Sequence, residues 1–123
     1  MGLTTEDSIA FVGRMAQTAS QYGLAIGLKN SIDILPSVSE YVQFAVNEEC
    51  AAMQECSGYD SFLATGKPVF HIEYSAGASA ACQDSRFSTV IKDLSLNGWV
   101  EYCDGSSYTT PTSGDSRRNT GGH

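Results

Sequence analysis

Four short apolar runs recur along the chain and constrain its fold more than any other feature. They cover residues 24–28, 44–46, 68–72 and 88–91, and each passes directly into charged or amide residues. Their starts are 20, 24 and 20 residues apart, which leaves room for a strand, a loop, a short helix and a return. Near-continuous apolar strands at such intervals are typical of parallel sheets covered by helices. We therefore predict an α/β fold of four parallel βα units.

An antiparallel sheet of hairpins is the alternative interpretation of the same runs. Tight hairpins favour Asn-Gly or Asp-Gly turns, and no such turn joins any two of the runs. The βα interpretation is therefore preferred.

Helices are predicted between and before the runs. The first has apolar residues at spacings of three and four, a capping pair at Thr4 and Asp7, and an end at Gly23. Two shorter helices are expected around residues 35–41 and 59–65. The apolar face of the first helix consists of Ile9, Val12, Met15, Ala16 and Ala19.

Composition bounds the size and the partners. The 123 residues suit one domain, and 7 basic against 14 acidic residues give a net charge of −7, which disfavours nucleic acid and anionic membranes as partners. No apolar run is long enough to span a bilayer. From residue 104 the chain is rich in Gly, Ser, Thr and Asp. We expect a folded domain over residues 1–103 and a disordered polar tail over residues 104–123.

Four cysteines in a short chain suggest disulfides and an oxidising compartment. Three pairings are possible, and free buried thiols are the alternative. Cys50 with Cys56 closes a short loop, and Cys82 with Cys103 brackets the last run, so this pairing is favoured. The amino terminus has no basic and apolar segments of a secretory signal. We therefore hypothesise that the chain belongs to a larger, secreted protein.

The carboxyl ends of the runs are the expected place for a site, because ligands of parallel α/β folds bind where the βα loops converge. Glu48 directly follows one run after the amide Asn47, and Glu73 ends the next run. Two carboxylates facing one cleft would suit glycoside hydrolysis. Alternatively, Glu73 is a surface carboxylate or pairs with Lys29 or Lys92.

His71 and Glu73 form a His-x-Glu pattern that zinc deaminases also contain. The Pro-Cys-x-x-Cys that completes the deaminase signature is absent from the sequence, and Cys50 and Cys56 lack zinc-knuckle spacing. We therefore expect His71 to be a core residue, and we expect no metal ligand and no cofactor. The sequence also lacks the glycine-rich motifs of nucleotide-binding proteins.

Four blocks of sequence together resemble glycoside hydrolase family 114, and the resemblance extends over residues 2–103. The family comprises secreted (β/α)8 TIM barrels, namely endo-α-1,4-polygalactosaminidases and related α-galactosaminide or α-galactoside hydrolases. The Asn-Glu-x-Cys block at Asn47 is the most specific, together with the Lys-Asn pair upstream. The blocks are residues 23–30, 44–50, 66–74 and 87–93.

The resemblance implies that the four runs are strands five to eight of such a barrel, its carboxyl-terminal half. It assigns Glu48 as a catalytic glutamate. It implies that the sugar is held by Lys29, Asn30, Asn47, Glu73 and Tyr74. The family's second catalytic carboxylate, an aspartate at the end of strand four, would precede the matched part. The pairing of Glu48 with that aspartate is preferred here over a pairing with Glu73.

The expected function is hydrolysis of α-linked galactosamine or galactose glycans, weak or absent in this chain alone. One alternative is a non-catalytic carbohydrate-binding remnant, with Trp99, Tyr74 and Tyr102 as apolar faces for sugar rings. Another is a half-barrel that needs a partner chain and self-associates through its open sheet edges.

Overall fold

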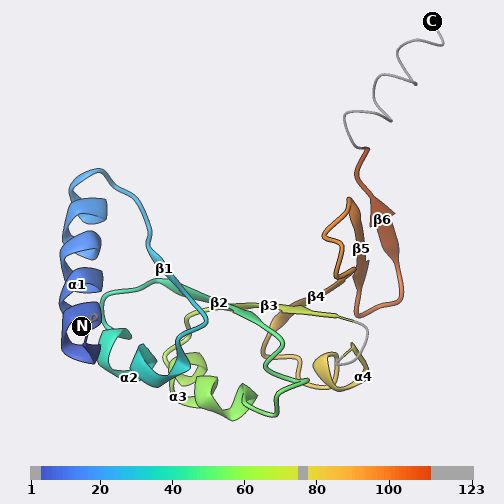
Figure 1. Ribbon diagram of the computed structural model, residues 1–123, viewed down its shortest axis with the longest axis horizontal. Coiled ribbons are helices and arrows are strands. Elements are labelled where there is room, and N and C mark those ends of the chain that lie inside the picture. The colour runs from blue at the N-terminus through green and yellow to red at the C-terminus, as the bar shows by residue number, and fades with distance from the viewer. Residues whose placement is uncertain (1–3, 75–77, 112–123) are drawn as a thin grey trace, which may run out of the picture.

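The computed structural model describes residues 4–74 and 78–111, and one six-stranded sheet forms its centre (Figure 1). The strands follow one another across the sheet in chain order. The first four pair in parallel, and the last two continue the sheet antiparallel. The α/β class and the parallel arrangement of the four runs are thus confirmed. The strands are β1 (Gly27–Lys29), β2 (Phe44–Glu48), β3 (Val69–Glu73), β4 (Ser88–Lys92), β5 (Trp99–Tyr102) and β6 (Ser107–Thr109).

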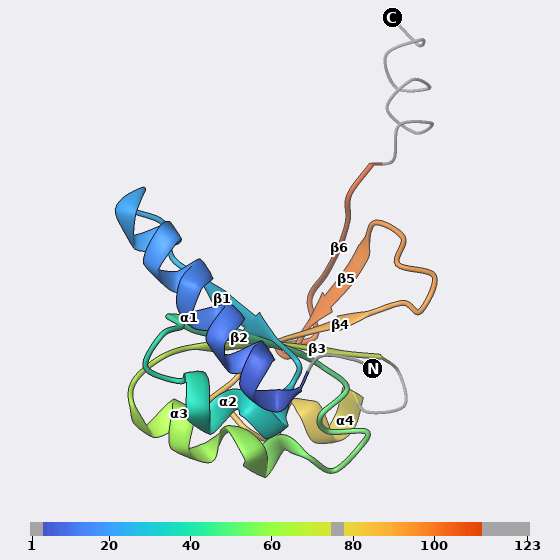
Figure 2. The same ribbon diagram turned by 60° about the vertical axis from the view of Figure 1, so that its left-hand side comes forward.

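Short helices connect the parallel strands, and α2, α3 and α4 lie under one face of the sheet (Figures 1 and 2). The longest helix, α1, stands at the β1 end and contacts α2. In the part of the chain that the structure describes, no helix is long and apolar enough to cross a membrane. The helices are α1 (Thr5–Gln21), α2 (Leu35–Val38), α3 (Asp60–Ala64) and α4 (Ala78–Ala81), with 3-10 turns η1 (Ile32–Ile34) and η2 (Cys56–Tyr59).

The ends of α1 are where the sequence predicts them. Thr4 and Asp7 form a reciprocal capping box with two hydrogen bonds of 3.1 Å, and Thr4 lowers the pKa of the Asp7 carboxyl through these bonds. Gly23 follows the helix at φ +69°, a conformation that glycine adopts without strain. The predicted apolar face is only partly covered, because Val12 packs against the core whereas Met15 stays 46% exposed.

Side chains alternate between the two faces of the sheet, and the faces differ in kind. Ala45 and Val69 point toward the helices and join the buried core. Val46 and Phe70, each one residue further on, point to the open face, where Phe70 is 45% exposed. The covered face therefore supplies the core, and the open face retains exposed apolar surface. Core residues from the helices and their flanking loops are Leu35, Val42, Tyr59, Phe62 and Phe87.

The region after β4 differs from the prediction. An antiparallel hairpin of β5 and β6 follows β4, so the parallel part contains four strands joined by three crossovers. Strand β6 lies within residues 104–123, where the sequence predicts disorder. That prediction is wrong for Ser107–Thr109, because a turn with Gly105 at φ +89° pairs this polar segment with β5 through backbone hydrogen bonds. Residues 112–123 lie outside the described part.

Both favoured disulfides are present. Cys50–Cys56 closes the loop after β2, and Cys82–Cys103 ties the segment after α4 to the residue after β5. The second bond thus fixes the hairpin to the parallel part of the sheet.

Replacing Gly98 by alanine should weaken the β5–β6 hairpin. A Cβ there would collide with the backbone carbonyl oxygen of Thr110, whose N–H donates to the Gly98 carbonyl at 2.8 Å. We expect a loss of about 1–3 kcal/mol in the free energy of unfolding, with faster amide hydrogen exchange in β6.

Gly13→Ala is the matched control. Gly13 lies inside α1, and a Cβ there would come no nearer than 3.7 Å to the Tyr41 ring. This change should therefore raise the free energy of unfolding by about 0.5–1 kcal/mol. Unchanged exchange in β6 of the Gly98→Ala variant would contradict the tight approach of the two strands.

Candidate active site

The carboxyl ends of β1, β2 and β3 lie side by side, and polar residues gather there. A hollow of about 610 Å³ opens at this edge, and Asn30, Asn47 and Glu48 contribute to its wall. Three further carboxylates line it from the loops, those of Asp33, Glu49 and Glu55. The hollow therefore has an acidic wall, which favours a cationic or hydroxyl-rich ligand.

Glu48 is the last residue of β2 and projects on the open face, with its side chain 32% exposed. Its Oε1 lies 3.3 Å from Nζ of Lys29, the last residue of β1. Its backbone N–H donates to Oδ1 of Asn30 at 2.9 Å. A carboxylate is thus held at the rim by an ion pair and a fixed backbone, while it remains accessible to a ligand.

Asn30, directly after β1, fixes the backbone at the end of β2. It has φ 55°, in the left-handed region that asparagine tolerates better than most residues. Its N–H donates to the Val46 carbonyl at 2.7 Å, and its Oδ1 also accepts from Nδ2 of Asn47 at 3.2 Å. Asn30 therefore joins the ends of β1 and β2 directly beneath Glu48.

Asn47 acts inside the protein. It is 2% exposed, and its Oδ1 accepts from the Cys50 N–H at 2.8 Å, while its Nδ2 reaches Asn30. The sequence predicts contact with a sugar for Asn47, but these bonds indicate a residue that shapes the loop after β2.

Glu73 occupies a different place from the predicted one. The register pairs Glu48 with Ile72, so the next residue, Glu73, points to the opposite, helix-covered face. Glu73 is 0% exposed, which is incompatible with sharing an open cleft with Glu48. That expectation is wrong, because adjacent strand ends do not imply a shared face, whereas contact of Glu73 with a sugar stays a prediction.

The alternative partners proposed for Glu73 are also wrong. Lys29 pairs with Glu48, and Lys92 Nζ donates to the carbonyls of Asn97 and Trp99 at 3.0 and 2.6 Å. The Glu73 carboxylate instead accepts from the N–H groups of Ala51 and Ala52, both at 3.1 Å. It thereby holds the first turn of the loop that follows Glu48.

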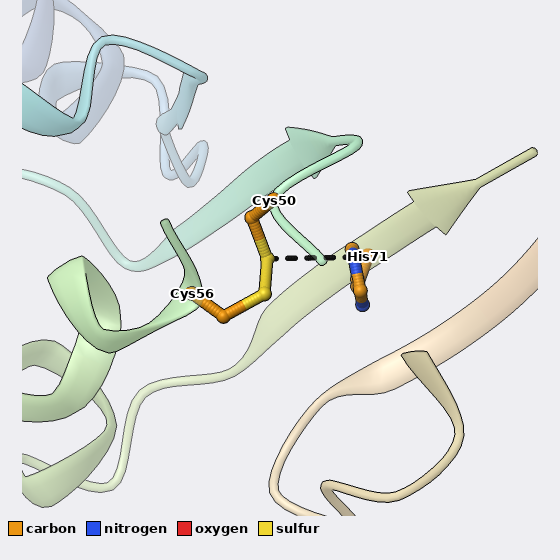
Figure 3. A group of neighbouring side chains, drawn as sticks. All are labelled: Cys50, Cys56 and His71. Atoms are coloured by element: carbon orange, nitrogen blue, oxygen red, sulfur yellow. Dashed lines mark hydrogen bonds between the residues drawn. A yellow bond between two sulfur atoms is a disulfide. The ribbon is translucent and has the colours of Figure 1, made fainter. Parts of the chain in front are cut away.

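His71 is a core residue, 1% exposed, as the sequence predicts. Its Nε2 lies 2.5 Å from Oε2 of Glu73, and its Nδ1 lies 3.1 Å from Oγ1 of Thr89. The same Nε2 lies 3.4 Å from Sγ of Cys50, one end of the Cys50–Cys56 disulfide (Figure 3). Thr89 carries no sequence signal of this role, since a threonine in a strand is ordinary.

Tyr74 follows β3 and is 7% exposed. Burial raises the pKa of its phenol, and the negative charges of Glu48 and Glu49 raise it further. The phenol of Tyr74 therefore lies within reach of the charge of Glu48, and its contact with a sugar stays a prediction. Of the other two aromatic residues considered for sugar rings, Tyr102 is 43% exposed and Trp99 is partly buried on β5.

Comparison with known proteins decides the family. A sequence model of the glycoside-hydrolase family GH114 matches residues 1–108. The chain belongs to family GH114. The resemblance found in the sequence is thereby confirmed. The match also includes β6 as far as Tyr108.

A solved structure agrees with this assignment. This chain is similar to Ega3 of Aspergillus fumigatus, with 46% sequence identity and a TM-score of 0.75. The Ega3 crystal structure is a complex with galactosamine. The alignment covers 82% of this chain and 47% of that one, so this chain spans less than half of the Ega3 chain. A search among curated proteins gave no match.

Removing the charge of Glu73 should destabilise the protein. Glu73→Gln leaves two backbone N–H groups and His71 without their anionic acceptor in a buried place, and breaking such a buried arrangement costs about 3–5 kcal/mol. Urea unfolding without reductant measures the loss. The exposed Glu55→Gln in the same loop is the control, and equal losses in both variants would contradict an anchoring role for Glu73.

Proposed function

We propose that the chain forms part of the active site of an O-glycosyl hydrolase for α-linked galactosamine or galactose glycans, with Glu48 as one of two catalytic carboxylates. The observation that carries the proposal is the position of Glu48 at the carboxyl end of a parallel strand, on the open face and at the rim of the acidic hollow. Its family, GH114, and its similarity to Ega3 support the proposal.

The residues around Glu48 have distinct proposed roles. Lys29 forms an ion pair with the Glu48 carboxylate, and Asn30 fixes the backbone of Glu48. Tyr74 donates a hydrogen bond at the rim from its neutral phenol. Glycoside hydrolysis needs one carboxyl group to protonate the leaving oxygen and a second to act as base or nucleophile, and Glu48 serves as one of these.

The acidic wall favours an amino sugar. A protonated 2-amino group carries one positive charge, and Asp33, Glu49 and Glu55 line the hollow beside Glu48. Galactosamine is the ligand in the Ega3 crystal structure, which supports the same substrate class for this chain. The two disulfides suit an oxidising compartment, and we propose that the protein is secreted.

Turnover by the 123-residue chain alone should be weak or absent. Glu73 is on the wrong face to be the second carboxylate, and the family resemblance places that carboxylate before the matched part. The chain also spans only 47% of the Ega3 chain.

Hydrolysis of α-1,4-linked galactosamine oligomers tests the assignment, with released reducing ends as the measurement. We expect a trace rate that Glu48→Gln lowers about 10²–10⁴-fold, because a positioned acid or base contributes that much. Glu40→Gln, an exposed carboxylate outside the hollow, should retain the rate.

Three results would contradict parts of the proposal. Turnover that is independent of Glu48 would reject its catalytic role. Full turnover that Glu48→Gln abolishes would reject the expectation of weak activity. Oligomer binding with no turnover at all, equal in both variants, would favour the carbohydrate-binding remnant.

A half-barrel that needs a partner chain is the second candidate, and the open face of the sheet favours it. Phe70 is 45% exposed there, Tyr102 and Tyr108 on the hairpin are 43% and 58% exposed, and β1 and β6 end the sheet without a further strand in the described residues. We expect a second copy to cover this surface. Sedimentation velocity should then show dimers that Phe70→Asp dissociates, whereas a concentration-independent monomer would reject this candidate.

A further inference from the structure

The corner between the loop after β2 and strand β3 brings three metal-binding side chains together. Sγ of Cys50, Sγ of Cys56 and Nε2 of His71 lie within 4.8 Å of one another (Figure 3). In a tetrahedral zinc site, with Zn–S about 2.3 Å and Zn–N about 2.0 Å, a sulfur and a nitrogen ligand lie about 3.5 Å apart. Cys50 Sγ and His71 Nε2 are 3.4 Å apart, so two of the ligand atoms already have that separation.

A fourth ligand atom is adjacent. Oε2 of Glu73 lies 2.5 Å from the same Nε2, a hydrogen-bond separation that must open to about 3.3 Å for both atoms to bind one tetrahedral zinc. The N–H groups of Ala51 and Ala52 hold the carboxylate at this corner. Two thiolates, an imidazole and a carboxylate are a donor set that suits Zn²⁺.

The far side of the imidazole is also prepared for a metal. Nδ1 of His71 lies 3.1 Å from Oγ1 of Thr89, a hydroxyl that can donate or accept. When Nε2 gives its proton up to bind a metal, Nδ1–H can donate to Thr89, so the ring stays neutral and oriented.

The corner is accessible from one side. A hollow of about 290 Å³ is lined by Cys50, Cys56, His71 and Asp84, and Cys56 is only partly buried. Asp84 at this entry is paired with Arg86, which donates to its carboxylate at 2.8 Å. A small dithiol and a divalent cation can both approach the disulfide through this hollow.

We propose that reduction of the Cys50–Cys56 disulfide creates a binding site for Zn²⁺ formed by Cys50, Cys56, His71 and Glu73. In the oxidised protein the two sulfurs are bonded to each other, so the loop is closed covalently. In the reduced protein the metal closes the same loop. The sequence predicts no metal ligand here, because ligand spacing is a weak guide when one ligand comes from the next strand.

The reduction step balances with a dithiol as reductant. A thiolate of the dithiol attacks Sγ of Cys56, the S–S bond breaks, and Cys50 leaves as a thiolate beside His71. The second thiol of the reductant attacks the mixed disulfide and releases Cys56, so two electrons pass to the protein and the reductant becomes a cyclic disulfide. The two protons of the dithiol pass to Cys50 and Cys56, and Zn²⁺ binding to the two sulfurs as thiolates releases them to solvent.

Cobalt substitution of the full 123-residue chain tests the site. When Co²⁺ is added to the reduced chain, one ion should bind per chain. The complex should show sulfur-to-cobalt charge-transfer absorption and the intense visible bands of tetrahedral Co²⁺. Added Zn²⁺ should abolish both spectral signals. The oxidised chain should give neither signal. The same spectra should persist in the Cys82→Ser/Cys103→Ser double variant, which removes the other pair of cysteines.

Single variants identify the ligands. Cys56→Ser should lower the charge-transfer intensity by about half, because one of two sulfur ligands is lost. Thr89→Val should weaken Zn²⁺ binding by about 10-fold or more through the lost orientation of His71, and His71→Gln should weaken it further. A reduced wild-type chain without tetrahedral cobalt bands would overturn the proposal. Cobalt binding unaffected by Cys56→Ser or His71→Gln would do the same.

Folding of the reduced chain gives a second readout that needs no variant. Zn²⁺ should raise the thermal midpoint of the reduced chain, or restore its circular dichroism if reduction unfolds it, and should leave the oxidised chain unchanged. A reduced chain whose thermal midpoint and circular dichroism do not respond to Zn²⁺ would overturn the proposal. Neither result bears on the proposed catalytic role of Glu48.

Discussion

The buried carboxylate of Glu73 is the contact on which the candidate site depends. It reaches across from the end of β3 to accept two backbone N–H groups of the loop after β2, and it holds His71 against the disulfide of that loop. An ionised group with no exposure is costly unless several donors satisfy it, and three do so here. The buried carboxylate therefore fixes the loop that directly follows Glu48.

The two faces of the sheet divide the polar residues by task. Asn47, His71 and Glu73 lie on the helix-covered face. There Asn47 and Glu73 accept hydrogen bonds from the loop after β2, and His71 contacts Glu73. Glu48 and Lys29 lie on the open face, where they remain accessible. Because neighbouring residues of a strand point in opposite directions, Asn47 and Glu48 serve the structure and the site from consecutive positions. Polar residues at the end of one strand therefore differ in role according to the face of the sheet on which they lie.

Much of this was predictable from the chain itself. Repeated apolar runs gave the parallel strands, the Thr4–Asp7 spacing gave the start of α1, and cysteine spacing gave both disulfides. The face of Glu73 was not predictable, because it depends on the register between β2 and β3. Strand β6 was missed for a related reason: backbone pairing with β5, rather than apolar burial, determines it, and composition reports only burial.

The open face of the sheet determines the surroundings of Glu48. The helix layer buries a core for one face only, so Glu48 stands beside exposed apolar surface rather than inside an enclosed, water-poor cleft. Withdrawing a carboxyl group from water raises its pKa, as a general acid near neutral pH requires, whereas the open rim leaves the Glu48 side chain in contact with water. Whatever covers this face would therefore do two things at once: bury the apolar strand residues and change the environment of Glu48. Stability and catalysis at this edge are coupled through one surface.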